Sequence, residues 1–348
     1  MEYRQLGRSG LMVSALSFGT MTLGGDGGFA KMGSSDRGAA MRQVDACLDA
    51  GINLLDTADA YAQSEEVLGE ILQGRRARWL VATKARFARA PGVNAAGLSR
   101  HHLIEACEDS LRRLRTDHID LYQLHGWDGR TPVEETLGAL DHLLAAGKIR
   151  YVGVSNFSAW HVMKMIGAAA AMRSVAPVAQ QVHYSLANRD IEQELVPLAI
   201  DQGLGILAWS PLSGGLLSGK YRQGEPAPAG ARGSIPGADH WTAESEARIY
   251  RTIDELAGIA TERGVAASAV ALAWVLARPQ VASIIVGARD ERQLTQNLAA
   301  AELTLSAEEL DRLERASRPP LLYPYWHQLR HASDRLAAAD LSLLGPYL

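Results

Sequence analysis

The chain has 348 residues, of which 47% are hydrophobic and 21% are charged, a balance typical of a folded protein with a large buried core. The net charge of −4 comes from interspersed charges of both signs, so neither nucleic acid nor an anionic membrane is expected as a partner. Neither the charged start of the chain nor any later run supplies the roughly 18 apolar residues that span a bilayer. The sequence therefore predicts a cytoplasmic protein.

Short runs rich in Val, Ile and Leu alternate with longer amphipathic segments, as in parallel strands that are buried on both faces and joined by crossover helices. The strand candidates are residues 15–18, 52–55, 79–83, 119–124, 151–154, 178–181, 205–208 and 282–286. The helix candidates are residues 36–49, 65–72, 100–113, 132–146, 158–170, 191–201, 243–263 and 267–276. This pattern predicts one α/β domain over residues 1–348, a (β/α)₈ TIM barrel, because such barrels routinely exceed the usual domain size.

Some segments lie outside this repeat. Residues 1–13 contain the turn Gly7-Arg8-Ser9-Gly10 between short mixed runs, which predicts a β-hairpin at the N-terminal end of the barrel. Residues 221–240 follow the seventh strand, are rich in Gly, Pro and Ala, and predict a long loop on the cofactor side. Residues 24–35 have no assigned role, and residues 319–348 are expected to form a C-terminal extension packed on the barrel.

Polar residues follow the predicted strands at the points where the strands end. Asp56, Lys84, His125 and the pair Ser155-Asn156 each come directly after an apolar run, and later strands add further examples. The later examples are Gln181, Trp209, Ser210 and Gly287. Each has an ordinary structural reading when taken alone, such as a helix cap or a solvated strand end. The C-terminal ends of barrel strands meet on one rim, however, so the set together predicts an active site.

The ordered motifs resemble the signatures of the aldo-keto reductase superfamily. The central ones are Asp56-Thr57-Ala58-Asp59-Ala60-Tyr61, Thr83-Lys84 and Tyr122-Gln123-Leu124-His125. Flanking ones are Gly7-Arg8-Ser9-Gly10, Phe18-Gly19-Thr20, Gly153-Val154-Ser155-Asn156-Phe157, Trp209-Ser210-Pro211-Leu212, and Gly287-Ala288-Arg289 with Gln293 and Asn297. Among subgroups, the chain is most similar to the bacterial reductases related to the potassium-channel β-subunits. Residues 24–35 and 319–348 depart from the common pattern.

The resemblance implies a catalytic group of Asp56, Tyr61, Lys84 and His125 that reduces a small-molecule carbonyl compound to an alcohol or oxidises the alcohol. Carbonyl reduction requires a hydride at carbon and a proton at oxygen, and Tyr61 is the implied proton donor. The Lys84 ammonium favours the phenolate, so it should bring the pKa of Tyr61 down from about 10, while Asp56 offsets the desolvation of Lys84. A neutral His125 imidazole would orient the carbonyl oxygen.

The resemblance implies NADPH as the cofactor. No Gly-x-Gly-x-x-Gly turn follows a first strand, which argues against a Rossmann dinucleotide site, so the cofactor is expected to bind in the manner of the family. The residues that the resemblance assigns to it are Gly19, Thr20, Met21, Asp56, Ser155, Asn156, Gln181, Trp209, Ser210, Pro211, Leu212, Gly214, Leu217, Gly219, Lys220, Gly287, Arg289, Gln293 and Asn297. Trp209 would stack on the nicotinamide, although it could simply fill the barrel mouth. Arg289 would bind the 2′-phosphate, and Lys220 is a second candidate for this role. Alternatively, Arg289 is simply a solvated residue at the start of a helix.

Three further questions stay open at this stage. A regulatory protein that senses bound NADPH is the main alternative to an enzyme, and a barrel enzyme with a Schiff base at Lys84 is a weaker one, since Asp56 would keep that lysine charged. Tyr61, Phe87, His125 and Trp127 are the candidate substrate contacts, with aldehydes, aryl ketones and bulkier ketones all possible. No metal site is expected from the two cysteines, and the sequence does not indicate an oligomeric state.

Overall fold

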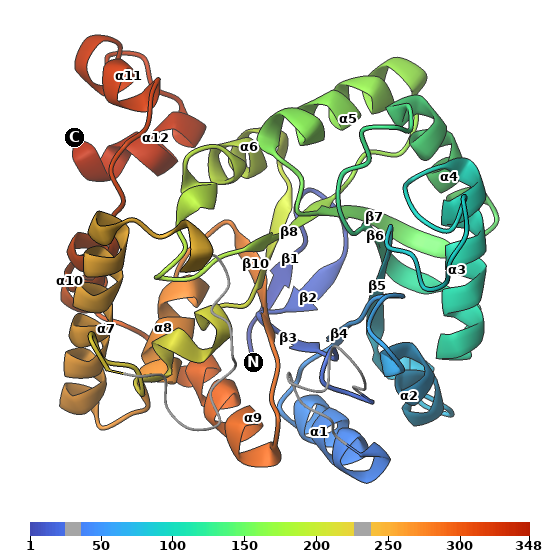
Figure 1. Cartoon of the computed structure of the whole chain (residues 1–348), viewed down its shortest axis with the longest axis horizontal. Helices are drawn as coiled ribbons and strands as arrows, with labels where there is room; N and C mark the ends of the chain where they lie inside the picture. Colours follow the sequence, from blue (N-terminus) through green and yellow to red (C-terminus); the bar gives the residue numbers. More distant parts are fainter. Residues whose placement is uncertain (25–35, 226–237) are drawn as a thin grey trace.

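The computed structural model describes residues 1–24, 36–225 and 238–348, and it contains a closed barrel of parallel strands surrounded by helices (Figure 1). The barrel strands are β3 (Leu16–Gly19), β4 (Leu54–Asp56), β5 (Leu80–Ala85), β6 (Ile119–Leu124), β7 (Ile149–Ser155), β8 (Ala179–His183), β9 (Gly205–Trp209) and β10 (Val281–Val286). They follow one another in chain order around the barrel, and β10 closes it by pairing with β3. The (β/α)₈ TIM-barrel prediction is confirmed.

Helices surround the barrel, and the last two belong to a C-terminal extension beside it (Figure 1). They are α1 (Arg37–Asp49), α2 (Ser64–Ile71), α3 (Arg100–Leu114), α4 (Val133–Ala145), α5 (Ala159–Met172), α6 (Leu195–Gln202), α7 (Ala243–Arg263), α8 (Ala267–Leu276), α9 (Glu291–Leu298), α10 (Ala307–Ser317), α11 (Tyr325–His331) and α12 (Ala338–Leu344). In the described ranges no single helix is long and apolar enough to cross a membrane, and α7 and α8 pass that test only as a pair bent by 104°.

One helix begins well after its predicted start, whereas the other predicted helices agree within one or two residues at each end. The sequence predicts residues 191–201, but a separate 3₁₀ turn occupies Asp190–Glu192 and α6 begins only at Leu195. Pro197 accounts for the difference, because proline has no N–H to bond to the previous turn and is tolerated only in the first turn of a helix. The helix then ends at Gly203, which adopts a left-handed conformation with φ of 67°.

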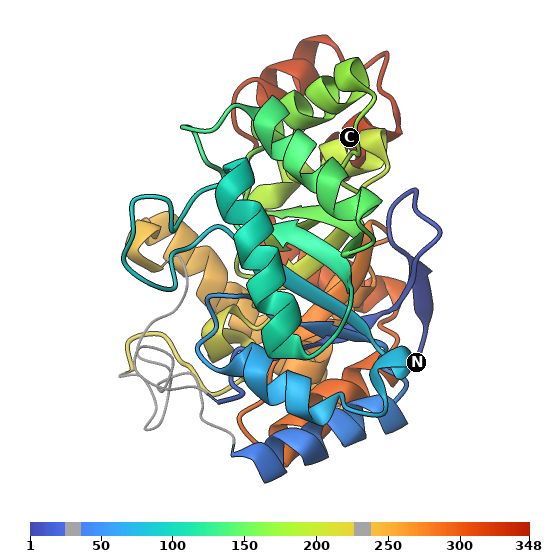
Figure 2. The same cartoon turned by 90° about the vertical axis from the view of Figure 1, so that its right-hand side faces the viewer.

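The N-terminal hairpin is present and closes one end of the barrel. Strand β1 (Tyr3–Gln5) pairs antiparallel with β2 (Met12–Ser14), and Figure 2 shows the hairpin at one end of the barrel. Its side chains Leu6 and Val13 are fully buried and pack inside the barrel. The barrel residues around them are Leu54, Ala82, Leu121, Ala179, Leu207, Ala282 and Ile285. The barrel interior is therefore a packed core at this end, and the opposite rim is left for chemistry.

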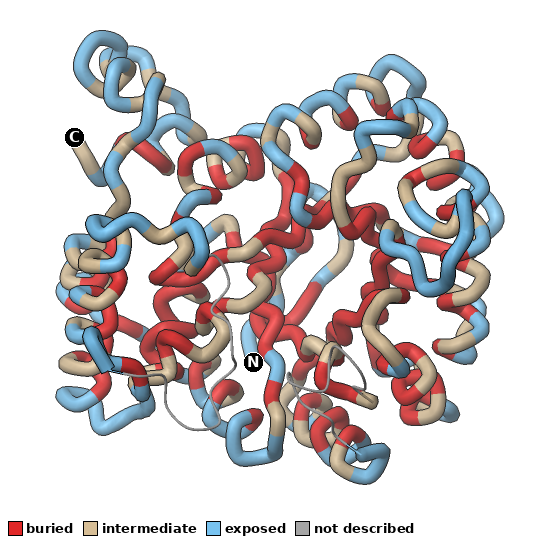
Figure 3. Tube along the Cα trace, viewed as in Figure 1, coloured by how far each residue is buried: buried red, intermediate tan, exposed pale blue. Residues whose placement is uncertain are grey.

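A second and larger core fills the space between the strands and the helices, and the buried residues in Figure 3 follow the strands and the inner helix faces. Residues 319–348 contain α11 and α12, and α12 lies against α6 (Figure 1). The Tyr325 hydroxyl donates to Glu194 at 2.9 Å, and Leu343 and Leu344 are buried. The expectations for residues 24–35 and 221–240 lie largely outside the described residues.

Candidate active site

The predicted catalytic residues converge at the open rim. Asp56 is the last residue of β4, Lys84 lies near the end of β5, and both side chains are buried. The Lys84 ammonium donates to Asp56 Oδ2 at 2.7 Å, to the carbonyl oxygen of Thr57 at 2.8 Å and to the Tyr61 hydroxyl at 3.5 Å. Tyr61 reaches this position from the loop between β4 and α2. Carboxylate, ammonium and phenol thus form one continuous chain of contacts.

Two glutamines hold the second oxygen of the carboxylate. Gln181 donates to Asp56 Oδ1 at 2.8 Å and Gln123 donates to the same atom at 3.3 Å. Sequence reasoning assigned Gln181 to the cofactor and gave Gln123 no role. The signal was present, because Leu121, Gln123 and His125 alternate on the interior face of β6 and Gln123 is polar where a core residue would be apolar. Both glutamines fix the orientation of Asp56.

Burial and neighbouring charges together decide the protonation of the phenol and the ammonium. Burial disfavours the charged form of Lys84, but Asp56 and Tyr61 outweigh it, so the pKa of Lys84 lies above its ordinary value and the side chain stays charged. Burial raises the pKa of Tyr61, and the opposing effect of Lys84 does not cancel it. The expectation that Lys84 brings the pKa of Tyr61 below its usual value is therefore wrong for the protein alone, because desolvation of the phenolate is the larger effect. Tyr61 is protonated and can act as an acid.

His125 follows β6 and faces the phenol. The centroids of the Tyr61 and His125 rings are 5.6 Å apart at an interplanar angle of 74°. Burial, together with the positive charges of Lys84 and Arg86, lowers the pKa of His125 to about 3, so the imidazole is neutral, as the sequence analysis expects. Its Nδ1 atom is buried and has no hydrogen-bond partner within the described residues. A polar atom of this kind requires a partner, which a bound molecule could supply.

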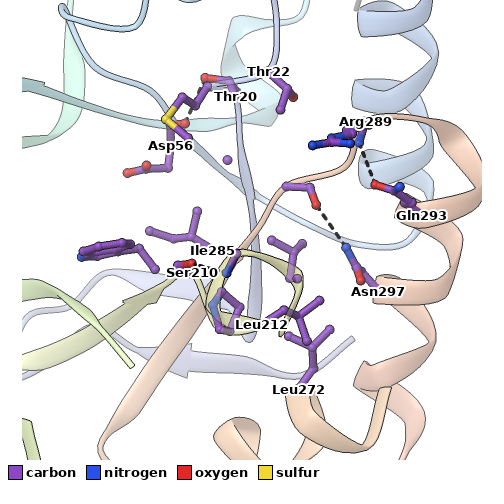
Figure 4. A pocket seen from close by; sticks show the side chains of 18 of the residues that line it. Thr20, Thr22, Asp56, Ser210, Leu212, Leu272, Ile285, Arg289, Gln293 and Asn297 are labelled. Atoms are coloured by element: carbon purple, nitrogen blue, oxygen red, sulfur yellow. Dashed lines mark hydrogen bonds between the residues drawn. The ribbon is translucent and has the colours of Figure 1, made fainter. Parts of the chain in front are cut away.

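A cavity of about 620 Å³ opens from the predicted catalytic residues and runs toward α9, and Figure 4 shows side chains that line it. Its volume is in the range of cofactor and ligand sites. The sequence-predicted residues that line it are Gly19, Thr20, Met21, Asp56, Tyr61, His125, Ser155, Asn156, Gln181, Trp209, Ser210, Pro211, Leu212, Gly214, Lys220, Gly287, Arg289, Gln293 and Asn297. Sequence reasoning missed Thr22, Gly215, Ser218, Ser268, Leu272, Ile285, Val286 and Gln296. Gln296 could have been found, since it lies one turn after Gln293.

Four predicted contacts lie outside this cavity. Leu217 is fully buried in the outer core, because the 3₁₀ helix Ser213–Ser218 turns it away from the rim, and Gly219 follows at the end of that helix. Phe87 packs edge-on against His125 with centroids 4.9 Å apart, so it lies at the rim beside the catalytic group. Trp127 is stacked on His161 at 4.1 Å, which holds its ring against α5.

Trp209 ends β9 and lines the main cavity, while its neighbours Asn156 and His183 line a smaller cavity of about 270 Å³. Its indole Nε1 donates to Asn156 Oδ1 at 3.1 Å, and Asn156 has a positive φ of 58°. His183, at the paired position on β8, stacks on the indole with centroids 4.5 Å apart and an interplanar angle of 17°. Burial lowers the pKa of His183 to about 4, so a neutral ring supports the indole. The indole is thus fixed at its edge and on one face.

The far end of the cavity combines a cation with a loop held by amide side chains. Arg289 lies there beside Gln293 (Figure 4), and Lys220 also lines the cavity. Gln293 accepts from the backbone N–H of Arg289 at 3.1 Å, and Asn297 donates to the Gly287 carbonyl oxygen at 3.2 Å, as Figure 4 shows. Gly214, with φ of 67°, adopts a left-handed conformation in the 3₁₀ helix after β9, which brings backbone close to the cavity. This end suits an anionic group.

Known proteins are similar to this chain over most of its length. The sequence profile of the Aldo/keto reductase family matches residues 15–318. A probable voltage-gated potassium channel subunit beta from Oryza sativa subsp. japonica is 36% identical over 331 residues, covering 90% of this chain and 96% of the relative. A protein of the same name from Arabidopsis thaliana is 35% identical over 323 residues, with the same coverage. The uncharacterized oxidoreductase YrpG from Bacillus subtilis strain 168 is 38% identical over 326 residues, covering 89% and 94%.

Proposed function

Because the chain belongs to the aldo/keto reductase family and is an oxidoreductase, we propose that it reduces aldehydes or ketones to alcohols with NADPH, and that Tyr61 donates the proton. One observation carries this proposal. Asp56, Lys84, Tyr61 and His125 meet at the open rim, beside a cavity large enough for a dinucleotide. A protonated phenol next to a neutral imidazole is the arrangement that delivers a proton to a carbonyl oxygen.

In this proposal NADPH lies along the cavity. The polar side chains of Ser155, Asn156 and Gln181 would hold the carboxamide, and the cavity-side face of Trp209 would cover the planar nicotinamide. The opposite face of that indole is already occupied by His183, so one face remains for a ring. At the far end, Arg289 would bind the 2′-phosphate. When bound, the cofactor supplies a hydride at nicotinamide C4.

The chain's own residues perform the remaining steps. His125 donates a hydrogen bond to the carbonyl oxygen and orients it, since its imidazole is neutral. As negative charge develops on this oxygen, the oxygen takes the phenolic proton of Tyr61. The phenolate that remains faces the Lys84 ammonium, which stabilises it and thereby lowers the barrier to proton transfer. Asp56 keeps Lys84 in place and compensates its charge.

The steady-state rate of NADPH oxidation with a panel of aldehydes and ketones tests the proposal, and Tyr61→Phe is the decisive variant. We expect turnover to fall by about 10²–10⁴-fold, the usual contribution of a general acid, while the NADPH dissociation constant stays within about twofold. Tyr151→Phe is the matched control, because Tyr151 packs near the closed end of the barrel and should keep normal rates. Near-normal rates in Tyr61→Phe would exclude the assigned role.

The names of the two plant relatives support a second candidate, an NADPH-binding regulatory subunit with little turnover. The same panel separates the two. A protein that binds NADPH tightly but turns over none of the carbonyl compounds would favour regulation over catalysis.

A further inference from the structure

Arg86 lies at the open rim, next to the catalytic histidine. Interior-facing residues alternate along β5, so Ala82 and Lys84 face the inside of the barrel and Arg86 continues the same face one step farther out. The register of the sheet pairs Lys84 with Gln123, and the backbone N–H of His125 donates to the Ala85 carbonyl at 3.1 Å. Arg86 and His125 are therefore neighbours at one level of the rim.

The surroundings of this guanidinium do not neutralise it. Arg86 Nη2 donates to the carbonyl oxygen of Trp127 at 3.3 Å, and the guanidinium carbon is 5.1 Å from the centroid of the Phe87 ring. Its Nε atom is buried without a hydrogen-bond acceptor in residues 1–24, 36–225 and 238–348. No carboxylate of those residues lies within ion-pair distance of Arg86, whereas Lys84 is paired with Asp56.

A half-buried cation without a counter-charge is unfavourable in a free protein, since it loses hydration and gains no partner. Its positive charge is also one of the causes that lower the pKa of His125, in keeping with its place beside the imidazole. An anionic ligand at this position would supply the missing partner. The position is level with the imidazole that orients the carbonyl, so the anion and the carbonyl group can belong to one small molecule.

We propose that Arg86 binds a carboxylate of the substrate, and that the preferred substrates are aldehydes or ketones that carry a carboxylate a few bonds from the carbonyl group. This inference rests on the proposed function. The ring of Phe87 lies beside both Arg86 and His125, so it provides an apolar wall for the part of the substrate between its two polar ends. Charge-assisted pairing with guanidinium is strong and directional, and it therefore discriminates between charged and neutral substrates.

The test compares 4-carboxybenzaldehyde with 4-nitrobenzaldehyde, which have nearly the same shape and differ in charge. In the full-length protein with NADPH, Arg86→Gln should lower kcat/KM for the carboxylate substrate by about 10–100-fold and for the nitro substrate by less than about threefold. Arg86→Lys should recover part of the loss, because it keeps the charge without the planar fork. Arg89→Gln is the matched control: Arg89 follows on the same loop but is paired with Glu66, so the ratio of the two substrates should not change.

An equal fall with both aldehydes would overturn the inference, because it would mean that Arg86 only supports the loop around Trp127. An unchanged ratio in Arg86→Gln would overturn it as well. A second measurement does not depend on turnover: the affinity of benzoate for the protein with NADP⁺, followed by tryptophan fluorescence, should fall about tenfold or more in Arg86→Gln. If the wild type reduces neither aldehyde, the proposed function fails, and the benzoate titration alone then decides for or against the carboxylate site.

Discussion

Asp59 is a buried carboxyl group in the loop that carries Tyr61, and its neutralisation should stabilise the protein at alkaline pH. The residue is 2% exposed, and its Oδ1 atom has no hydrogen-bond partner within the part of the chain that the structure describes. Burial, and then the negative charge of Glu65, raise the pKa of Asp59 from 3.8 to about 7, although Arg113 and Arg89 act in the opposite direction. The perturbation is Asp59→Asn, which keeps the shape and removes the charge.

The direction in which the free energy of unfolding changes with pH follows from proton binding. Between about pH 4 and pH 7 the folded chain holds a proton on Asp59 that the unfolded chain has lost, so the free energy of unfolding falls as the pH rises through this window. Above pH 7 both states are charged and the penalty is complete. A shift from 3.8 to about 7 corresponds to about 4 kcal/mol at 1.36 kcal/mol per pKa unit. Relaxation of the neighbours reduces this limit, and we expect about 2–4 kcal/mol.

The assay is thermal unfolding of wild type and Asp59→Asn between pH 5 and pH 9. The variant should already melt higher at pH 5, which lies above the unfolded-state pKa of 3.8, and the difference should widen to roughly 3–6 °C at pH 8, given the unfolding entropy of a chain of this length. Asp49→Asn removes an exposed carboxylate of α1 and should give no pH-dependent difference from wild type. Parallel curves for wild type and Asp59→Asn at every pH would refute the argument.

Three further predictions concern the cofactor and the catalytic cation. Lys84→Met should lose at least about 10²-fold in turnover and shift residual activity to higher pH, because Tyr61 loses the charge that favours its phenolate; an unchanged pH profile would contradict this. Arg289→Ala should weaken NADPH binding by about 1.5–3 kcal/mol and leave NADH unaffected in fluorescence titrations, whereas equal weakening would assign Arg289 to loop support. His183→Ala should weaken both cofactors by about two- to tenfold, since Trp209 loses a stacked partner; unaltered affinities would show that the indole needs no such support.

Much of the fold and of the candidate site could be predicted because their signals are local. Buried parallel strands appear as apolar runs, and the residue that follows such a run must lie on the open rim, which is how Asp56, Lys84 and His125 were placed. The Ser306-x-x-Glu309 capping box was an equally local signal for α10, and it was overlooked. The start of α6 could likewise have been derived from Pro197 alone.

The remainder depends on distances that the sequence does not contain. Gln123 and Gln181 are far apart in the chain and meet only because β6 and β8 bring them to one carboxylate oxygen. The protonation of Tyr61 depends on how deeply the phenol is buried, and a charge argument from Lys84 alone gave the wrong sign. Leu217 shared a polar motif with true cavity residues, yet the tight turn of its 3₁₀ helix directs it into the core.

The hairpin at the closed end of the barrel can make some of its contacts only late in synthesis. Arg4 donates hydrogen bonds to the carbonyl oxygens of Leu276 and Val281, and the latter lies 277 residues farther along the chain. Strand β3 likewise finds its second neighbour only when β10 has left the ribosome. Until then the nascent protein is an open sheet with two unpaired edges, the form that is most prone to pair with another chain. A product that ends before residue 281 keeps both edges, so late truncation leads to aggregation rather than to a smaller active barrel.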